Sequence, residues 1–507
     1  MFVRHSLSLD HLPQKAPQRG AELRIAALSQ ELLPLMRRHD LALHFSAPTP
    51  TGLCIADATH NQTNAYKIRG ALAAVAEARR EGRRLVITAS AGNHGAGVAL
   101  AARMESMKAL VFVPESAPEV KVEKIRSFGA TIVQAGETFD DALALAMDDF
   151  RLEAGEAAFI HPFDSTTVAA GQGTIGLEIL DHLKYLACHQ PYERVRLFLP
   201  VGGGGLLAGV ASTVKTLWDS RLPQPEIVGV IDESSPAALL GTLFGRPVAA
   251  VPDTIADGTK VALIGETFLS VAHLVDHMML VRHDEIVSAM RRHERATGLK
   301  LEGAGALALA GEELARRHGL FSNRLPTLSL AVVTGRNIDP DVFDRELATH
   351  RRLDTTRDIR QAFDIRIPER DGELLHFLRT VERFNIASLT YKQRPGTSAG
   401  NLRAEFEISR DAVAELHGAV MKDFPGSRRL DEGHEMLYRI GAPVASAYHD
   451  ELITLDDQPG SFKRCVEALT QAGSFGSVGF VFYRKHAQAG RRAQVVLGRH
   501  RTTANEA

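Results

Sequence analysis

The sequence predicts an α/β protein with a twisted, mostly parallel sheet between helices, followed by a smaller α+β region. Short apolar runs alternate with helical patterns from about residue 67 to residue 340, which is the rhythm of an α/β domain. A polar, charged segment at 351–357 ends this rhythm. Beyond it, a strand–turn–helix pattern occurs twice. We therefore expect one large α/β domain and two small α+β units.

The expected strands of the large domain are short runs of β-branched or aromatic residues, nearly uninterrupted by charge. Parallel strands that are covered on both faces have this composition. Helical patterns at 71–80, 95–104 and 119–128 accompany the first of them. The expected strands are 85–88, 109–113, 131–133, 158–161, 195–201, 227–231 and 328–333.

Two similar segments follow the charged linker. The segment 362–378 reads as an alternating strand, a turn with Gly372 and an amphipathic helix, and the segment 448–466 has the same order with Gly460 in its turn. This pattern predicts an internal duplication. The expected domains are 1–350, 351–440 and 441–507, with further strands at 389–391, 403–408 and 478–483.

The composition favours a small-molecule partner. A chain of 507 residues exceeds what a single hydrophobic core normally supports. Its 59 Lys plus Arg nearly balance its 61 Asp plus Glu, so charge provides no strong attraction to nucleic acid or to an anionic membrane. We expect no nucleic-acid partner and no membrane partner.

The three cysteines, Cys54, Cys188 and Cys465, are far apart and lack Cys-x-x-Cys spacing. This argues against a disulfide framework and a thiolate metal site. No secretory signal follows Met1, and no apolar run approaches the length of a membrane span. We expect a cytoplasmic protein. No carboxylate cluster has convincing cation spacing, so no metal is assigned.

A run of four glycines at 202–205 follows the expected strand 195–201 and opens a helical pattern. Successive glycines leave backbone N–H groups free to point at one centre, and the helix adds its positive N-terminal end. This arrangement predicts a phosphate site. The alternative is a tight strand-to-helix turn, which needs only one or two glycines.

Two further segments carry groups for chemistry. Lys67 stands just before the helical pattern 71–80, where burial would lower the pKa of its amine toward the free form that makes imines. Most lysines at helix starts are solvated, so Lys67 indicates an imine-forming amine only in combination with the other motifs. The segment Ser90 to His94 lies between a strand and a helix, where N–H groups suit a carboxylate, or where His94 merely caps a turn.

Six motifs occur in the order seen in threonine and serine dehydratases, and the chain resembles this family of fold-type-II pyridoxal-phosphate enzymes over about residues 45 to 345. The two C-terminal units resemble the paired ACT-like regulatory domains of biosynthetic threonine ammonia-lyases. The motifs are Asn64-Ala-Tyr-Lys-Ile-Arg-Gly-Ala, Ala89-Ser-Ala-Gly-Asn-His-Gly, His161-Pro-Phe-Asp, Ala170-Gly-Gln-Gly-Thr-Ile-Gly-Leu-Glu-Ile, Gly202-Gly-Gly-Gly-Leu and Glu302-Gly-Ala-Gly-Ala.

The resemblance implies a catalytic domain with two open, mostly parallel sheet subdomains and a cytoplasmic homo-oligomer, either a dimer or a tetramer. It also implies elimination of water from threonine or serine, giving 2-oxobutanoate or pyruvate and ammonia. Isoleucine or valine would bind the C-terminal units as effectors. A related racemase, a β-replacement enzyme and a catalytically silent amino-acid sensor are the alternatives.

The resemblance also implies the roles of individual residues. Lys67 would be the Schiff-base lysine, and Asn93 would hydrogen-bond the phenolic oxygen of the cofactor. Thr334 would face the pyridine nitrogen, where a neutral hydroxyl makes the ring a weaker electron sink and favours elimination over transamination. The phosphate would be held by Gly202, Gly203, Gly204, Gly205 and Leu206, and the substrate carboxylate by Ser90, Ala91, Gly92, Asn93 and His94.

The chain departs from the family pattern near the lysine. Ala65 and Tyr66 stand where the family usually has Ser-Phe, and Arg336 replaces a small residue next to Thr334. Arg336 either enters the pocket and reads a second carboxylate, as of 3-hydroxyaspartate, or points to solvent. Glu302 either lies behind the cofactor or caps a helix.

Overall fold

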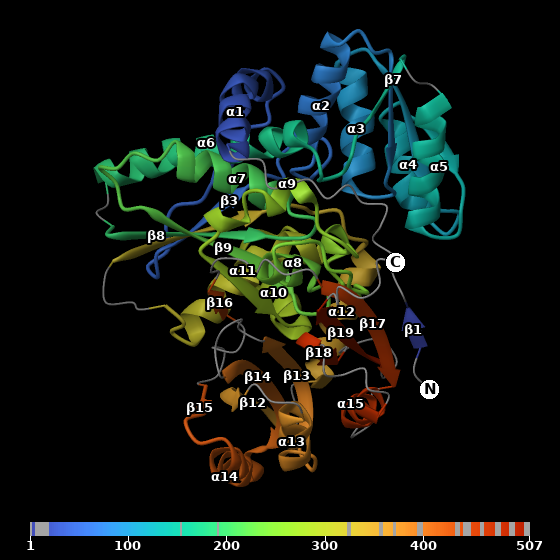
Figure 1. Ribbon diagram of the computed structural model, residues 1–507. Helices are drawn as coiled ribbons and strands as arrows, with labels where there is room; N and C mark the ends of the chain where they lie inside the picture. Colours follow the sequence, from blue (N-terminus) through green and yellow to red (C-terminus); the bar gives the residue numbers. More distant parts are fainter. Residues whose placement is uncertain are drawn as a thin grey trace.

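The computed structural model describes residues 3–5, 20–152, 155–189, 192–321, 326–353, 358–368, 372–392, 399–430, 437–439, 448–456, 461–471, 478–485 and 492–500. Figure 1 shows three layered bodies, each built on one sheet: a small four-stranded sheet at the upper right, a seven-stranded sheet in the middle and an eight-stranded sheet at the bottom. We call them the small sheet, the large sheet and the C-terminal sheet. The small and large sheets with their helices form the N-terminal half.

The large sheet has a parallel centre of five strands and one antiparallel strand at each edge. Its central strands are apolar along nearly their whole length because helices cover both faces. The strands, in spatial order, are β16 (Leu437–Arg439), β10 (His277–Val281), β9 (Pro225–Asp232), β8 (Arg194–Pro200), β11 (Thr327–Val333), β3 (Leu53–Asp57) and β2 (His44–Phe45).

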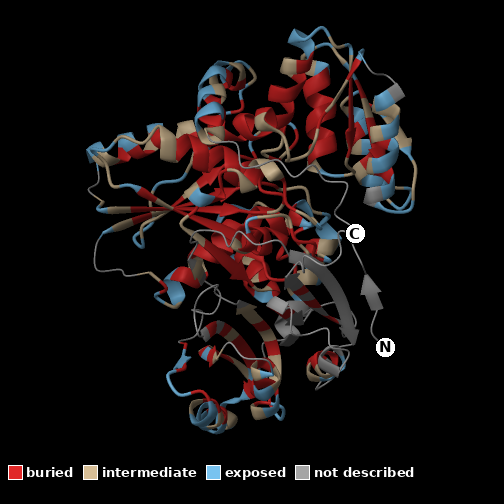
Figure 2. Ribbon diagram, viewed as in Figure 1, coloured by how far each residue is buried: buried red, intermediate tan, exposed pale blue. Residues whose placement is uncertain are grey.

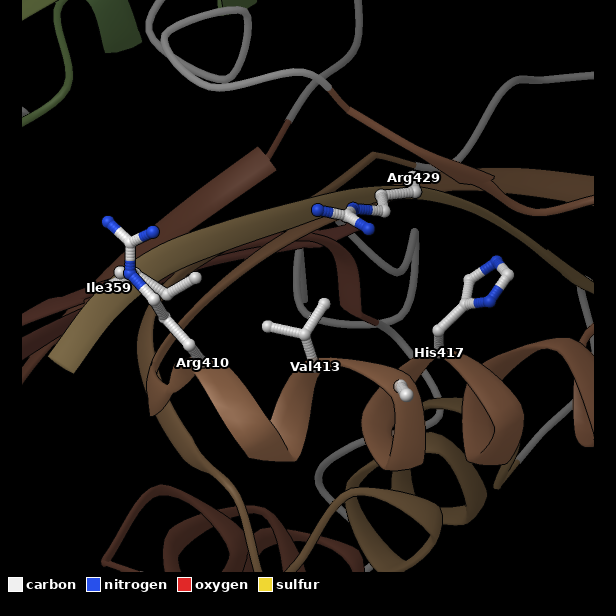
Figure 3. A pocket seen from close by; sticks show the side chains of 6 residues that line it. Ile359, Arg410, Val413, His417 and Arg429 are labelled. Carbon is white, nitrogen blue, oxygen red and sulfur yellow. The ribbon is translucent and has the colours of Figure 1, made fainter.

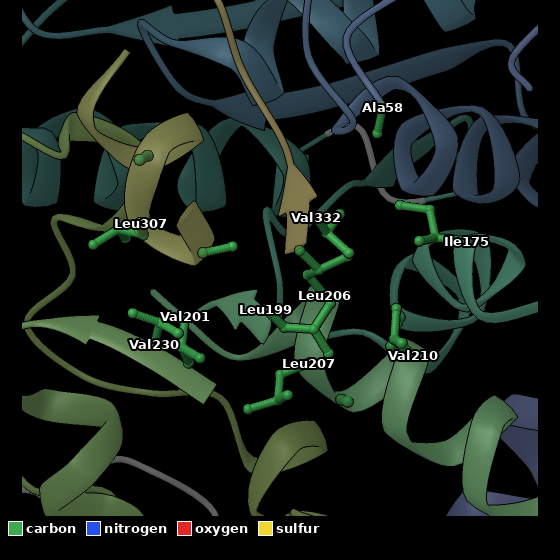
Figure 4. Close-up of a cluster of buried hydrophobic side chains, with 14 of the residues drawn as sticks. Ala58, Ile175, Leu199, Val201, Leu206, Leu207, Val210, Val230, Leu307 and Val332 are labelled. Carbon is green, nitrogen blue, oxygen red and sulfur yellow. The ribbon is translucent and has the colours of Figure 1, made fainter. Parts of the chain in front are cut away.

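Helix α7, with α1 and α6 behind it, covers one face of the large sheet, and α11 with α10 covers the other (Figure 1). Figure 4 shows the apolar side chains that join these layers, among them Leu199 of β8, Leu206 of α7 and Leu307 of α11. The helices are α1 (Ala21–Arg38), α6 (Thr166–His189), α7 (Gly205–Thr216), α8 (Ala237–Phe244), α9 (Glu266–Leu269), α10 (His283–Thr297), α11 (Gly303–Arg317) and α12 (Pro340–Leu353), with the short 3-10 turns η1 (Asp257–Thr259) and η2 (Ala272–Leu274).

The small sheet is wholly parallel and has its own helices. Its helix α2 also packs against α6, which joins the small sheet to the body of the large one. In spatial order its strands are β6 (Thr131–Gln134), β5 (Lys108–Val113), β4 (Leu85–Ala89) and β7 (Ala157–Phe159), and its helices are α2 (Ile68–Arg80), α3 (Asn93–Met104), α4 (Glu119–Ser127) and α5 (Phe139–Leu152).

The C-terminal sheet is antiparallel throughout. Pairing of β13 with β18 joins the two similar units edge to edge in one sheet. In spatial order its strands are β1 (Val3–His5), β17 (Tyr448–Asp456), β19 (Arg492–His500), β18 (Val478–Lys485), β13 (Asn385–Lys392), β14 (Ala399–Ser409), β12 (Asp358–Pro368) and β15 (Arg428–Arg429); its helices are α13 (Glu373–Thr380), α14 (Val413–Asp423) and α15 (Ser461–Gln471), with the 3-10 turn η3 (Arg410–Ala412).

The α/β fold class with parallel sheets and an α+β C-terminal region is confirmed. All seven strands predicted for the large domain are present, as β4 to β9 and β11. The prediction missed β3 and β10, which are short and complete the parallel centre of the large sheet. Within the described residues, no helix has the length and apolar character needed to cross a membrane.

Two short strands cross the predicted domain boundaries. The strand β16, assigned to the unit 351–440, pairs with β10 of the large sheet. The strand β1, assigned to the domain 1–350, pairs with β17, at the position that β15 occupies beside β12 in the first unit. Edge strands pair with whichever sheet offers free backbone groups, which sequence order does not reveal. The boundary at 440/441 and Gly460 lie outside the described residues.

Candidate active site

The predicted site residues meet where the small and large sheets face each other. Three of the segments follow the carboxyl ends of parallel strands: residues 90–94 follow β4, residues 202–206 follow β8 and Thr334 follows β11. Ligands of open α/β sheets bind at this edge. The segment that contains Lys67 is joined to the segment that contains Thr334, since the Tyr66 backbone N–H donates to the Thr334 carbonyl oxygen over 3.0 Å.

Lys67 immediately precedes helix α2 and is half-buried. Its Nζ donates to the carbonyl oxygen of Pro162 over 3.1 Å. Burial lowers the pKa of this amine to about 8, although the carboxylate of Glu302 acts in the opposite direction. Lys67 is therefore a cleft-facing amine with a large neutral fraction near pH 8.

The four glycines are required by close packing as well as by backbone exposure. A Cβ on Gly203 would lie 2.3 Å from the Phe163 ring, and a Cβ on Gly202 would lie 2.7 Å from the Cα of Thr259. Gly204 has a φ of 92° and lies against Phe268. A tight turn and a phosphate site are therefore compatible interpretations of the glycine run, because the absent Cβ atoms also allow Phe163, Thr259 and Phe268 to pack against it.

The backbone N–H groups of residues 202 to 206 are unpaired within the described part of the chain, although Gly203 to Leu206 are buried. Buried N–H groups almost always have an acceptor. The same segment begins helix α7, whose 12 residues direct a positive end toward it. The arrangement fits an anion such as a phosphate.

The segment Ser90 to His94 begins helix α3. The Ser90 hydroxyl accepts from the Gly92 N–H over 3.2 Å. The His94 ring lies away from this cup, with Nε2 3.2 Å from the Ile160 carbonyl oxygen, and burial lowers its pKa to about 3. A neutral, buried ring adds no charge, so a carboxylate here would meet backbone N–H groups at the start of α3.

Asn93 belongs to a polar network that the sequence did not reveal. Its Nδ2 donates to Glu302 Oε1 over 2.7 Å, and its Oδ1 accepts from Asn337 Nδ2 over 2.6 Å. Lys124 of α4 donates to the Asn337 side chain and, over 3.3 Å, to the Thr63 carbonyl oxygen. Nothing in the spacing of Lys124 marks it, because α4 enters the network only through the tertiary fold.

Glu302 is the residue that precedes helix α11, but its side chain makes no capping hydrogen bond to that helix and accepts from Asn93. Burial raises its pKa to about 7, and the hydrogen bond from Asn93 opposes this. A Cβ on Gly335 would lie 1.8 Å from Glu302 Oε1, so only glycine fits after Thr334. The Thr334 hydroxyl, buried, donates to the Ala304 carbonyl oxygen over 3.3 Å.

Arg336 follows neither of its two predicted alternatives. It is half-buried, and its Nη2 donates to the Thr59 carbonyl oxygen over 3.3 Å and to Asn64 Oδ1 over 3.2 Å. It therefore braces the loop that precedes Lys67. The guanidinium has carbonyl and amide partners in place of a second substrate carboxylate, because that loop, unpredictable from sequence, passes beside it.

These groups fit pyridoxal phosphate. Unpaired N–H groups suit its phosphate, the Lys67 amine suits its aldehyde, and neutral Thr334 suits a weakly basic ring nitrogen. Within the described residues no three metal-type ligands lie close enough together to hold an ion.

Comparisons with known proteins identify the family of the chain. The relatives include an "L-threonine dehydratase biosynthetic IlvA" from Burkholderia multivorans, 34% identical over 80% of this chain and 78% of the relative, and an "L-threonine ammonia-lyase" from Geobacter sulfurreducens, 40% identical over 55% of this chain and 65% of the relative. A solved threonine deaminase isoform 2 from Solanum lycopersicum is 29% identical with a TM-score of 0.57, covering 68% of this chain and 94% of that one. The model of the family "Pyridoxal-phosphate dependent enzyme" matches residues 34–335, and the chain belongs to that family.

Proposed function

We propose that this pyridoxal-phosphate enzyme deaminates threonine, and serine as a second substrate, to 2-oxobutanoate or pyruvate and ammonia. The observation that carries the proposal is the Lys67 amine, whose pKa burial lowers to about 8. Its Nζ donates to the Pro162 carbonyl oxygen, next to the Phe163 ring that packs on Gly203 in the cradle of unpaired N–H groups. The biosynthetic and ammonia-lyase names of the relatives support the same reaction.

Each proposed role follows from a group already located. Lys67 would hold the cofactor through its aldehyde, and with substrate bound its neutral amine would remove the α-proton. The N–H groups of 202–206 would hold the phosphate, and those at 90–94 would hold the substrate carboxylate. The cofactor would supply an electron sink for the α-carbon, limited by neutral Thr334, and the Lys67 ammonium would return its proton to the β-hydroxyl, which leaves as water.

We propose that the side chain of Asn93 holds the phenolic oxygen of the cofactor. Its amide is fixed by Glu302 and Asn337, so its orientation is set before any ligand arrives. Burial raises the pKa of Glu302 to about 7, so its protonated and ionised forms are both present near neutral pH. We propose Glu302 and Asn337 as positioning residues that act through Asn93.

The test is a comparison of purified wild-type protein with Lys67→Ala. We expect a visible absorption band that borohydride removes in the wild type and that is absent in the variant. We also expect 2-oxo acid release from threonine and serine to fall about 10³-fold or more. The control is Lys184→Ala, an exposed lysine of α6. Activity on 3-hydroxyaspartate alone, or racemisation without 2-oxo acid, would overturn the substrate proposal.

We also propose that the C-terminal sheet regulates the cleft after binding an amino-acid effector, isoleucine or valine. A buried ion cluster crosses the interface between the C-terminal sheet and the N-terminal half. Arg282 Nη2 lies 2.7 Å from Glu405 Oε1, and Arg360 Nη1 lies 3.4 Å from Glu233 and 3.5 Å from Glu405. Glu233 and Glu405 are 2% and 1% exposed, so the cluster is shielded from solvent.

Contacts continue from this cluster to the phosphate cradle. Asp232, next to Glu233, accepts from the Thr254 hydroxyl, and the Ser235 hydroxyl donates to the Thr259 carbonyl oxygen over 3.0 Å. Thr259 packs directly on Gly202. A shift of β12 or β14 therefore has a continuous packed route to the cradle.

The regulatory proposal is tested by titrating isoleucine and valine into the threonine assay. An effector changes activity only if it binds two states of the enzyme with different affinity. We expect inhibition or activation in the wild type and a weaker response in Glu405→Gln, which keeps the shape but removes the charge. If isoleucine and valine change the activity of the wild type and of Glu405→Gln equally, the ion cluster has no part in regulation.

We further propose that the enzyme is a cytoplasmic homo-oligomer, either a dimer or a tetramer. All three cysteines are free, as in proteins of a reducing compartment. Light scattering of the purified protein measures the assembly, and a mass of one chain would overturn this assignment.

A further inference from the structure

A groove lies on the outer side of the C-terminal sheet, between helix α14 and the strands β12 and β15. Figure 3 shows its side chains converging from the helix below and the strands above. The cavity volume is about 470 Å³, within the range of small-molecule sites, which is roughly 300–1,000 Å³. The lining residues are Ile359, Arg410, Val413, Ala414, His417 and Arg429.

The groove combines an apolar floor with basic groups held in place. Arg429 Nε donates to Gln361 Oε1 over 2.8 Å, and this leaves its two terminal nitrogens for the groove. Gln361 is 5% exposed and is fixed in turn by two backbone carbonyl oxygens. The His417 ring stacks on the Phe363 ring with centroids 6.0 Å apart. Both side chains are thus oriented before any ligand binds.

The positive charge of the groove is not neutralised by its surroundings. None of the lining residues is acidic. Two nearby carboxylates have partners elsewhere, since Glu415 lies 2.5 Å from Arg383, and Asp364 lies 2.7 Å from Arg403. Asp411, next to Arg410, does not line the groove. Arg410 has no acidic partner within the described part of the chain. Two guanidinium groups therefore face one cavity without a counter-charge.

We propose that this groove binds a short aliphatic carboxylate that lacks an ammonium group, of the 2-oxo acid class. Guanidinium groups recognise a carboxylate through charge-assisted hydrogen bonds. Ile359 and Val413 suit an aliphatic body. An amino acid would bring an ammonium group, and the lining offers no carboxylate to receive it while two arginines repel it. The site is separate from the cleft at Lys67, and the substrate assignment does not depend on it.

The position of the groove links it to the ion cluster. On β12, Ile359 faces the groove, and the next residue, Arg360, faces the N-terminal half, where it pairs with Glu233. Successive side chains of a strand point to opposite faces, so one strand carries both contacts. A ligand that moves β12 from the groove side acts on Arg360 directly.

The experiment is isothermal titration calorimetry on full-length, cofactor-loaded protein with 2-oxobutanoate, isoleucine and inorganic phosphate as separate probes. The variants are Arg429→Ala and the matched control Arg428→Ala. Arg428 pairs with Asp364 on the opposite face of β15, while Arg429 stands beside Phe363 on the groove side. Arg410→Ala is a second groove variant, which removes an exposed side chain and keeps the Gln361 contact.

We expect a 2-oxobutanoate site that weakens about tenfold or more in Arg429→Ala and in Arg410→Ala and stays within about twofold in Arg428→Ala. Turnover of threonine without added 2-oxo acid should be the same in all three variants, which separates this site from the catalytic assignment. Unchanged 2-oxobutanoate binding in both groove variants would overturn the proposal. If the groove variants lose isoleucine binding and keep 2-oxobutanoate binding, the proposed ligand class is wrong. It is also wrong if phosphate binds the wild type as tightly as 2-oxobutanoate does.

Discussion

In the large sheet, helices cover both faces of β8 and β9, whereas in the C-terminal sheet helices α13, α14 and α15 cover one face and the N-terminal half meets the other (Figures 1 and 2). The first arrangement gives strands that are apolar along most of their length. The second gives alternating strands such as β14, in which Leu402, Ala404 and Phe406 face the helices and Glu405 faces the interface. On β14 the buried charge thus lies on the face that meets the N-terminal half.

The two regions also bind charge differently. The cleft offers neutral donors, such as the N–H groups of residues 202–206, and an amine whose pKa burial has lowered. The groove on the C-terminal sheet offers exposed guanidinium groups that stay charged. A desolvated amine is suited to forming and breaking a covalent bond, and solvated charges are suited to reversible recognition.

The largest effect is expected where charge is buried at the interface. Glu405→Ala leaves Arg282 without its 2.7 Å partner, and we expect a loss of about 3–5 kcal/mol in the free energy of unfolding. Denaturant unfolding measures it. Glu407→Ala on the same strand removes an exposed carboxylate and should cost less than about 0.5 kcal/mol. Equal losses in the two variants would show that the interface charges are no more important than surface ones.

The glycine cradle should tolerate no side chain. Gly203→Ala places a Cβ 2.3 Å from the Phe163 ring, and we expect a loss of about 1–3 kcal/mol together with reduced cofactor content. Gly418→Ala in α14 has open space around its Cβ and should stabilise by about 0.5–1 kcal/mol. Thermal unfolding and the visible absorption band report both changes. A neutral Gly203→Ala would mean that the phosphate loop is loosely packed.

Glu285, at the start of α10, should make the stability of the protein depend on pH. Burial raises its pKa from 4.5 to about 7. Between these two values the folded protein keeps a proton that the unfolded chain has released, so stability falls as the pH rises from about 4.5 to 7. Glu285→Gln removes this loss and keeps the acceptor for the Arg282 N–H. We expect the variant to be about 1–2 kcal/mol more stable than the wild type at pH 8, and the difference to vanish below pH 4.5.

A second variant for this prediction is Asp284→Asn, at an exposed neighbour in the same helical turn. The Asp284 charge helps to raise the pKa of Glu285, so this variant should weaken the fall of stability with pH without abolishing it, because burial is the larger cause. A constant difference for Glu285→Gln would show that the carboxyl group titrates normally in the folded protein.

The smallest effect is expected for substrate choice at Arg336. Because its guanidinium holds the Thr59 carbonyl oxygen and Asn64, Arg336→Ala should lower kcat for threonine and 3-hydroxyaspartate alike. We expect the ratio of kcat/KM for the two substrates to change less than about threefold, since no substrate-specific contact is lost. A selective loss of activity on 3-hydroxyaspartate would show that Arg336 contacts the second carboxylate of that substrate.

Much of this protein follows from sequence because local patterns report local structure. Apolar runs nearly uninterrupted by charge predicted β4 to β9 and β11, and the run of four glycines marked the start of α7. Repetition of strand, turn and helix predicted two similar C-terminal units. The strands β3 and β10 were missed because each contains only one β-branched residue, so their composition does not mark them as strands.

What the sequence by itself determined is therefore the fold class, the family and the set of groups available for chemistry: one amine at Lys67, a glycine cradle and a neutral Thr334. Only the tertiary structure decided how these groups are tuned. The fold buries Lys67 and brings Asn93 into hydrogen bonds with Glu302 and Asn337. It also directs Arg336 to the Thr59 carbonyl oxygen. Glu405 is buried at an interface that the alternating pattern of its strand does not predict. The physical reason is that pKa values and ion pairs depend on desolvation and on partners brought together across the fold.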